Sequence, residues 1–173
     1  MDIHPESARM FQMDEAVEKA KNAAFRLLSG RAYTRVEIRR KLLGRHFGRQ
    51  VVDEVIGILG RLALIDDVDF ARRWVAERMR VRPMGRPMLA QDLRRRGVEA
   101  EVMDRVLDEA LAEVDMAAVA LNLLRSRQGR YRGLERQKAI SRMYAFLGRR
   151  GFDGTVAREV AETVWAEFGE ESF

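Results

Sequence analysis

A five-position apolar pattern occurs three times along this chain. Successive members are spaced by four, five, four and four residues in every copy. Steps of four follow one face of an amphipathic helix, and a step of five indicates a turn between two helices. The three copies are Ile38, Leu42, Phe47, Val51 and Val55; Leu89, Leu93, Val98, Val102 and Val106; and Met143, Leu147, Phe152, Val156 and Val160. A fixed period of this kind predicts a tandem array of similar helical units.

The copies lie 51 and 54 residues apart, so three units occupy nearly the whole chain. The pattern predicts an all-α fold, an elongated tandem array of three three-helix repeats with about nine helices and no strand. In this prediction the chain divides into a poorly ordered or partly helical N-terminal tail, 1–20; repeat one, 21–66; repeat two, 67–114; repeat three, 115–168; and a C-terminal tail, 169–173.

Several side chains have the spacing of helix N-caps. Thr34 and Glu37 form a T-x-x-E capping box, which predicts a helix that begins directly after Thr34. In repeat two an aspartate of the Asp66-Asp67 pair precedes an apolar helix, and Asp153 does so in repeat three. We expect these carboxylates to accept hydrogen bonds from the first free amides of their helices.

Glycines indicate where helices end. The first helix is expected over 14–29, and Gly97 and Gly151 stand in the five-residue step of repeats two and three. A residue of left-handed conformation commonly ends a helix in this way. Because His46 stands at the equivalent place in repeat one, we expect it to adopt the same conformation.

Charge changes sign in phase with the apolar repeat. Lys and Arg outnumber Asp and Glu by 8 to 1, 9 to 2 and 9 to 1 in segments 26–49, 72–96 and 125–150. The ratio is 1 to 5, 1 to 7 and 1 to 6 in segments 50–69, 97–115 and 151–173. Each repeat therefore begins basic and ends acidic, which favours a surface with a basic flank. The alternative is that these are solvated faces whose charges pair between neighbouring helices.

Composition limits the class of protein. The 173 residues are 47% hydrophobic and 34% charged, with a net charge of +5, which is typical of a folded, soluble chain. No apolar run approaches the length that spans a bilayer. Cysteine is absent, so no disulfide or thiolate chemistry is expected, and a reducing cytoplasm suits the chain.

Candidate catalytic residues are scarce. The only histidines are His4 and His46, and the sequence contains neither an H-E-x-x-H motif nor a phosphate-binding glycine loop. Asp66, Asp67 and Asp69 resemble a metal cluster only superficially, and helix capping explains them better. We therefore predict a protein that is not an enzyme, with no catalytic residue, metal or cofactor.

The arginines of the basic segments are the candidate binding residues. Part of their clustering has a local cause, since cations are favoured near helix C-termini. Around Tyr131 two arginines flank an aromatic ring, a combination that suits a base and its phosphates, although a plain exposed loop explains it equally well. The predicted nucleic-acid contacts are Arg72, Arg73, Arg78, Arg82, Arg86, Arg94, Arg95, Arg96, Arg130, Arg132, Arg149 and Arg150.

A helix-turn-helix DNA reader is a competing interpretation. In that motif the helix after the turn enters the major groove. Here the helix after each turn is the acidic one, as Asp53 and Glu54, Asp104 and Asp108, and Glu159 illustrate. Phosphates repel such a helix, so base reading by these helices is disfavoured.

Two stretches of the chain have a specific pattern. The first is Leu64-Ile65-Asp66-Asp67-x-x-Phe70-Ala71-x-x-Trp74-Val75, followed by Gly85-x-x-x-Leu89-x-x-x-Leu93-x-x-x-Gly97-Val98. The second is Leu147-Gly148-Arg149-Arg150-Gly151-Phe152. Both stretches resemble the RecX family, the regulators of the RecA recombinase. The resemblance covers about 20–168 and is most specific in the middle stretch. His46 departs from the glycine that is frequent at such turns.

The resemblance implies a cytoplasmic, non-catalytic modulator that binds the RecA–DNA filament and usually inhibits it. Recombination, ATPase and SOS co-protease activities of RecA are the expected targets, with DNA repair as the setting. The expected partners are the RecA filament and single- or double-stranded DNA, and the protein is expected to be a monomer that binds neither membranes nor a small-molecule substrate. Two alternatives remain: a general DNA-binding protein without a recombinase partner, and a scaffold that binds only proteins.

Overall fold

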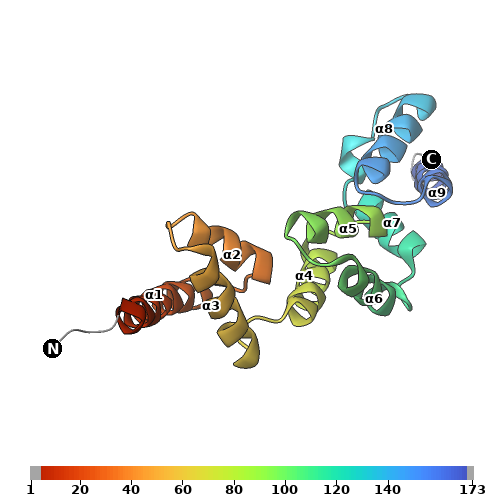
Figure 1. Ribbon diagram of the computed structural model, residues 1–173. Helices are drawn as coiled ribbons and strands as arrows, with labels where there is room; N and C mark the ends of the chain where they lie inside the picture. Colours follow the sequence, from red (N-terminus) through yellow and green to blue (C-terminus); the bar gives the residue numbers. More distant parts are fainter. Residues whose placement is uncertain (1–4, 171–173) are drawn as a thin grey trace. The chain divides into compact units, whose positions relative to one another are not determined.

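The computed structural model describes the backbone of residues 5–170 and the side chains of residues 10–167. Within this range the chain forms nine α-helices, one short 3-10 helix and no strand, which confirms the all-α prediction (Figure 1). The ends of the two predicted tails, 1–4 and 171–173, lie outside the described residues.

The helices follow one another with short connections. They are α1 (Pro5–Leu28), α2 (Arg35–Leu43), α3 (Arg49–Arg61), α4 (Asp67–Val81), α5 (Arg86–Arg95), α6 (Ala100–Leu111), α7 (Met116–Arg125), η1 (Gln128–Arg130), α8 (Arg136–Arg149) and α9 (Gly154–Glu170). Helix α1 begins nine residues before the predicted start at Asp14 (14 − 5 = 9). Proline is tolerated in a first helical turn and most residues that follow are good helix formers, so the helix extends beyond the apolar pattern that predicted it.

The chain divides into two compact units. Unit one comprises residues up to Arg72 together with Leu93–Met103, and unit two comprises Arg73–Asp92 together with residues from Asp104 onwards. In unit one, α1, α2 and α3 enclose a core that includes Ala20, Leu42 and Leu59. In unit two, α7, α8 and α9 enclose a separate core with Leu124, Met143 and Val164 among its members.

The repeated apolar positions of repeats one and three belong to these two cores or pack against them. Twelve of the fifteen are buried, and Phe47, Val102 and Val156 are half-buried. Full burial of such a side chain contributes about 1.5–3 kcal/mol, so the pattern marks the residues that hold each repeat together.

Each five-residue step is a helix-ending turn of the same design. The residue after the left-handed position donates its N–H to the carbonyl five residues back, at 3.4 Å from Phe47 to Leu42, 3.1 Å from Val98 to Leu93 and 3.2 Å from Phe152 to Leu147. This bond closes the end of the second helix and brings the two apolar residues of the step together.

The residue that turns the chain is left-handed in all three repeats. Its φ is 65° at His46, 79° at Gly97 and 76° at Gly151, which confirms the prediction for His46. Ala63 has a φ of 52° at the end of α3, where Leu64 donates to the carbonyl of Leu59 at 2.9 Å. This fourth turn escaped the sequence analysis because alanine carries no signal for a left-handed residue.

The predicted caps are present. Thr34 Oγ1 accepts the N–H of Glu37 at 3.1 Å, and the Glu37 carboxylate accepts the N–H of Thr34 at 3.3 Å. Asp66 Oδ1 accepts the amides of the second and third residues of α4, and Asp153 Oδ1 does the same in α9. Asp66 is therefore the cap of α4, which leaves Asp67 free to bind elsewhere.

Candidate nucleic-acid interface

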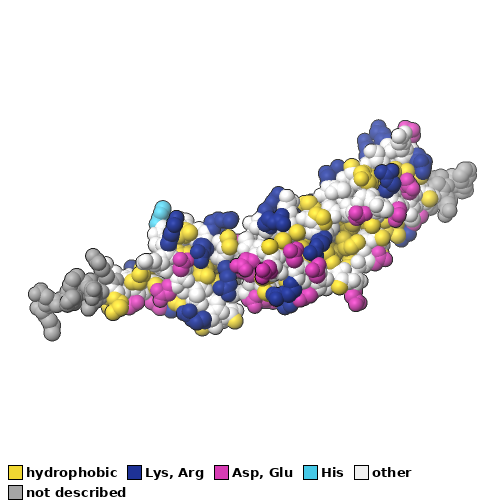
Figure 2. Space-filling model, turned by 45° about the vertical axis from the view of Figure 1, so that its right-hand side comes forward, with side chains coloured by type: hydrophobic (Ala, Val, Ile, Leu, Met, Phe, Trp, Pro, Cys, Tyr) yellow, Lys and Arg dark blue, Asp and Glu magenta, His cyan; other side chains and the backbone are white. Residues whose placement is uncertain are grey.

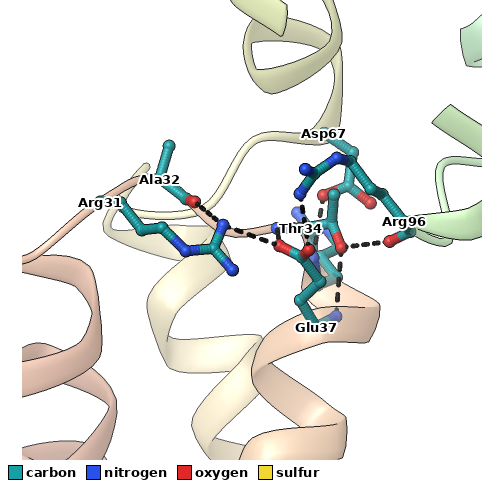
Figure 3. Close-up of polar contacts among 7 residues, drawn as sticks. Arg31, Ala32, Thr34, Glu37, Asp67 and Arg96 are labelled. Carbon is teal, nitrogen blue, oxygen red and sulfur yellow. Dashed lines mark hydrogen bonds and ion pairs between the residues drawn. The ribbon is translucent and has the colours of Figure 1, made fainter. Parts of the chain in front are cut away.

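The first joint between repeats lies in unit one, where the turn after α5 meets the start of α2 (Figure 3). The buried Thr34 hydroxyl donates to the carbonyl of Arg96 at 2.6 Å, and the Arg96 guanidinium donates to Glu37 at 2.9 Å. The carboxylate of Asp67, at the start of α4, accepts the N–H of Arg35 at 2.9 Å. Capping groups of one repeat therefore bind the next repeat, which sequence spacing alone did not indicate.

The second joint, in unit two, repeats this arrangement between repeats two and three. The N–H of Gly85 donates to the carbonyl of Arg150 at 2.8 Å, and the Arg150 guanidinium donates to the carbonyl of Pro83 at 3.0 Å. Burial, with Arg82 and Arg127 nearby, lowers the pKa of Arg150 below its ordinary value. Arg96 and Arg150 thus hold repeats together, although both were predicted as binding residues.

Other predicted arginines also have partners inside the protein. Arg86 binds Asp108 at 2.7 Å and Asp104 at 3.3 Å, across from α5 to α6. Arg78 lies 3.7 Å from Asp92 and stacks on Trp74 at 4.2 Å. The exposed Arg72, Arg73 and Arg132 also interact with neighbouring groups.

The alternating charges are partly used for ion pairs between helices. Arg39 of α2 binds Asp53 of α3, Arg86 of α5 binds the acidic α6, and Arg125 of α7 binds α9. Figure 2 shows basic and acidic side chains interspersed over the visible face. The alternative of pairing between neighbouring helices is therefore correct for these groups.

A basic pocket lies in repeat three. It encloses about 540 Å³, and its lining includes Arg127, Arg130, Arg142 and Arg149 with Phe146 at its base. The Arg127 guanidinium stacks over the Phe146 ring at 4.5 Å, and that of Arg150 lies 4.9 Å from the same ring. We call the four arginines that line it the repeat-three arginine cluster.

The structure brings two predicted residues, Arg130 and Arg149, into this cluster. Arg127 and Arg142 were missed by the sequence analysis. The seven-residue spacing from Arg142 to Arg149, two turns of one helix, and the three-residue spacing from Arg127 to Arg130 were the available signals. Arg82, Arg94 and Arg95 are exposed and lie outside the cluster.

Tyr131 does not offer a ring for base stacking. The side chain is only 5% exposed and belongs to the core of unit two with Leu124 and Met143. Both interpretations of the loop, a base-stacking aromatic and a plain exposed turn, are wrong at this residue, because repeat three uses the ring to fill the space under η1.

Two further features concern the kind of site. Among the side chains that the structure describes, no group of three or more histidines and acidic residues is arranged to hold a metal ion. Within the same part of the chain, no helix is both long and apolar enough to cross a bilayer.

The fold defines an all-helical protein of tandem repeats. Comparison with known proteins identifies the family. Residues 20–59 match the first three-helix domain of RecX, 66–107 the second and 113–161 the third. The chain belongs to the RecX family, which confirms the resemblance and, since that family consists of regulators, the prediction that this is not an enzyme.

Two relatives illustrate the extent of the similarity. Regulatory protein RecX of Amycolatopsis mediterranei is 34% identical over 162 residues, which cover 92% of this chain and 90% of the relative. Regulatory protein RecX of Mycolicibacterium smegmatis is 37% identical over 150 residues, or 83% of this chain and 78% of the relative.

Solved structures support the fold. The crystal structure of RecX from Lactobacillus salivarius has a TM-score of 0.76 at 21% identity and covers 87% of this chain and 97% of its own. A second crystal structure, of a regulatory protein RecX, has a TM-score of 0.81 at 22% identity over 94% of this chain and 79% of its own. At these identities the similarity concerns the fold alone.

Proposed function

We propose that this protein regulates the RecA recombinase by binding the RecA–DNA filament, and that it restrains strand exchange, ATP hydrolysis and SOS co-protease activity without catalysis of its own. The supporting observation is the match to all three RecX domains, 131 residues in total (40 + 42 + 49). The protein would act in the cytoplasm, because its partner RecA is located there. It would act as a monomer.

The candidate filament contacts are predicted arginines for which the described part of the structure shows no role at a joint or in an ion pair between helices. Arg82, Arg94 and Arg95 are exposed, and Arg130 and Arg149 line the basic pocket. Arginine suits phosphate because its planar guanidinium donates two parallel hydrogen bonds. The acidic helix α6 would face away from phosphate.

The contacts at the first joint decide which of the predicted arginines give an informative test. Charge reversal of Arg96 breaks its bond to Glu37 and loosens the joint, so its effect on binding is not a test of contact. The informative variant is Arg94→Glu/Arg95→Glu, which leaves that bond intact. Arg61→Glu/Arg105→Glu is the matched control, since it reverses two exposed arginines of α3 and α6, outside the predicted set.

The decisive measurement is the ATPase and strand-exchange activity of RecA from the same organism with increasing amounts of this protein. We expect inhibition by the wild type, weaker inhibition by Arg94→Glu/Arg95→Glu and full inhibition by the control variant. If RecA activity is unchanged by the wild type at stoichiometric excess, the proposal is wrong.

A general DNA-binding protein is the second candidate, and the basic pocket is the observation that favours it. It predicts tight binding to DNA alone at physiological salt, with no gain when RecA is added. Titration of labelled DNA with and without RecA therefore separates this candidate from a filament regulator. A scaffold that binds only proteins predicts no DNA binding in either titration.

A further inference from the structure

Position 142 differs from its equivalents in repeats one and two. The repeat aligns Glu37 with Met88 and Arg142, each directly before the first apolar position of its repeat. Glu37 binds the Arg96 guanidinium at the first joint. Met88 packs against Gly151 at the second, so closely that a Cβ on Gly151 would lie 2.7 Å from Met88 Cγ. In repeats one and two this position therefore contacts the turn of the next repeat.

In repeat three the equivalent position carries a cation. Arg142 is exposed, and no further repeat covers it within the described residues. Where Glu37 offers a carboxylate to an arginine, Arg142 offers a guanidinium. A partner at this face is therefore complementary if it is an anion.

The rest of the cluster strengthens this charge. Four guanidinium groups line the pocket, and no described acidic side chain lines it or forms an ion pair with any of them. The Nε of Arg127 is buried and has no hydrogen-bond partner among the described atoms. Like charges that line one pocket repel one another, and an anion with several acceptor oxygens relieves both the repulsion and the unmet donor.

We propose that the repeat-three arginine cluster binds a backbone phosphate of a nucleic-acid strand. A phosphodiester offers two non-bridging oxygens that share one negative charge, and Arg127, Arg130, Arg142 and Arg149 supply donors around one pocket. Phe146 does not stack on a base in this site, because Arg127 and Arg150 already lie against its ring. The contact is therefore electrostatic and independent of base sequence.

The inference rests on the proposed function only for the source of the phosphate, which is the DNA of the filament. Free nucleotides and pyrophosphate offer the same chemistry, so they are the competing source. A strand is favoured because the pocket is open at the surface and a nucleotide base would have to compete with the Arg127 and Arg150 guanidinium groups for the Phe146 ring.

The test uses Arg130→Gln/Arg142→Gln in the full chain, since both residues are exposed and the change should leave the fold intact. Anisotropy of fluorescein-labelled oligo(dT) is measured over a salt series. We expect affinity to fall about ten- to a hundredfold. The slope of log affinity against log salt should become shallower by about 0.7, for one lost phosphate contact to a single strand.

The matched control is Arg136→Gln/Lys138→Gln, which removes two charges from the first turn of α8, outside the pocket. It should keep most of the affinity. Equal losses in the two variants would show that only total charge matters, and no loss in the pocket variant would show that DNA binds elsewhere. Either result overturns the proposal, provided that circular dichroism confirms folding.

Calorimetric titration with ATP and with inorganic pyrophosphate separates the two sources. Binding of either compound more tightly than oligo(dT), abolished by the pocket variant, would assign the site to a free phosphate compound and overturn the proposal for a strand. Inhibition of RecA is measured in parallel. If the pocket variant binds DNA with normal affinity and inhibits RecA as the wild type does, the proposal for the pocket is wrong and the proposed function stands. If the wild-type protein binds DNA through the pocket but has no effect on RecA, only the proposed function is wrong.

Discussion

The hydroxyl of Thr34 donates a 2.6 Å hydrogen bond to the carbonyl of Arg96, 62 residues further along the chain. The same oxygen caps α2 by accepting the N–H of Glu37. At the equivalent joint of the next repeat pair, the N–H of Gly85 takes the place of the hydroxyl and the carbonyl of Arg150 accepts. The two joints use equivalent carbonyl acceptors, those of Arg96 and Arg150, but different donors, the Thr34 hydroxyl and the Gly85 N–H.

Removal of the Thr34 hydroxyl should therefore destabilise the first joint and α2 together. We expect Thr34→Ala to lower the free energy of unfolding by about 2–4 kcal/mol, because the cap is lost and the Arg96 carbonyl loses its donor. Urea denaturation measures this loss. Thr34→Ser keeps the oxygen and should cost less than about 1 kcal/mol, and a loss as large as that of alanine would contradict the role of the hydroxyl.

Position 85 requires glycine because there is no room for a side chain, and not because its φ is positive. A Cβ at this buried position would lie 1.7 Å from the carbonyl oxygen of Gly151, which is backbone and has no rotamer to move. Gly85→Ala should therefore separate the second joint and lower Tm strongly. Gly148→Ala in α8 has no atom within 4 Å of its Cβ, and we expect it to raise stability by about 0.5–1 kcal/mol. Equal effects of the two substitutions would contradict this account.

The left-handed conformation of His46 strains the backbone slightly, and a substitution by glycine should remove this strain. The residue is exposed and has a φ of 65°, which glycine adopts without steric cost. His46→Gly should raise the free energy of unfolding by about 0.5–1 kcal/mol and leave binding unchanged. Differential scanning calorimetry measures the shift in Tm, and a decrease would show that the imidazole makes a stabilising contact.

Gly97 combines the same φ with a close neighbour. A Cβ there would lie 2.5 Å from Val36 Cβ, whereas Gly133, with a φ of 75°, has open space around it. Gly133→Ala should cost about 1 kcal/mol for backbone strain alone. Gly97→Ala should cost about 1–3 kcal/mol more, because the turn must also move away from α2. Urea denaturation of both variants isolates the packing at the joint.

Asp67 makes the first joint sensitive to pH. Burial raises the pKa of its carboxyl above 3.8, and this outweighs the opposing effect of the Arg35 N–H. The folded state then binds the proton more tightly than the unfolded state, so the group's contribution is most favourable below 3.8 and declines as pH rises through the raised pKa.

Asp67→Asn removes this titration while keeping an oxygen for the Arg35 N–H. We expect the stability of the variant relative to the wild type to be higher at pH 7 than at about pH 4. Unfolding of both proteins by urea at the two pH values measures the difference. A relative stability that rises on acidification would mean that the pKa is lowered instead.

The local structure of this protein could be predicted from its sequence. The apolar spacing located the cores, because a helix face repeats every three to four residues whatever its surroundings. Thr34 and Glu37 predicted a cap, and His46 predicted a left-handed turn, since each effect depends on neighbours a few residues away. The division of the chain into three consecutive repeats could be predicted from the same short-range signals.

The candidate site was only half predictable. Arg130 and Arg149 were in the predicted set, but Arg127 and Arg142 entered it only when the loop before α8 folded against that helix. Arg96 and Arg150 carried the same basic signal and proved to hold joints. Charge along a sequence shows that cations are present, and it does not show which of them already have a partner.

The helices, their turns and the threefold repeat could therefore be predicted from local sequence signals. How the repeats join, and which arginines remain available, depends on the packing of segments that are far apart along the chain. The difference lies in the range of the interactions. Capping and amphipathic spacing act within one or two helical turns, whereas Thr34 and Arg96, or Gly85 and Arg150, meet only after separate segments have packed, at distances along the chain where sequence spacing carries no information.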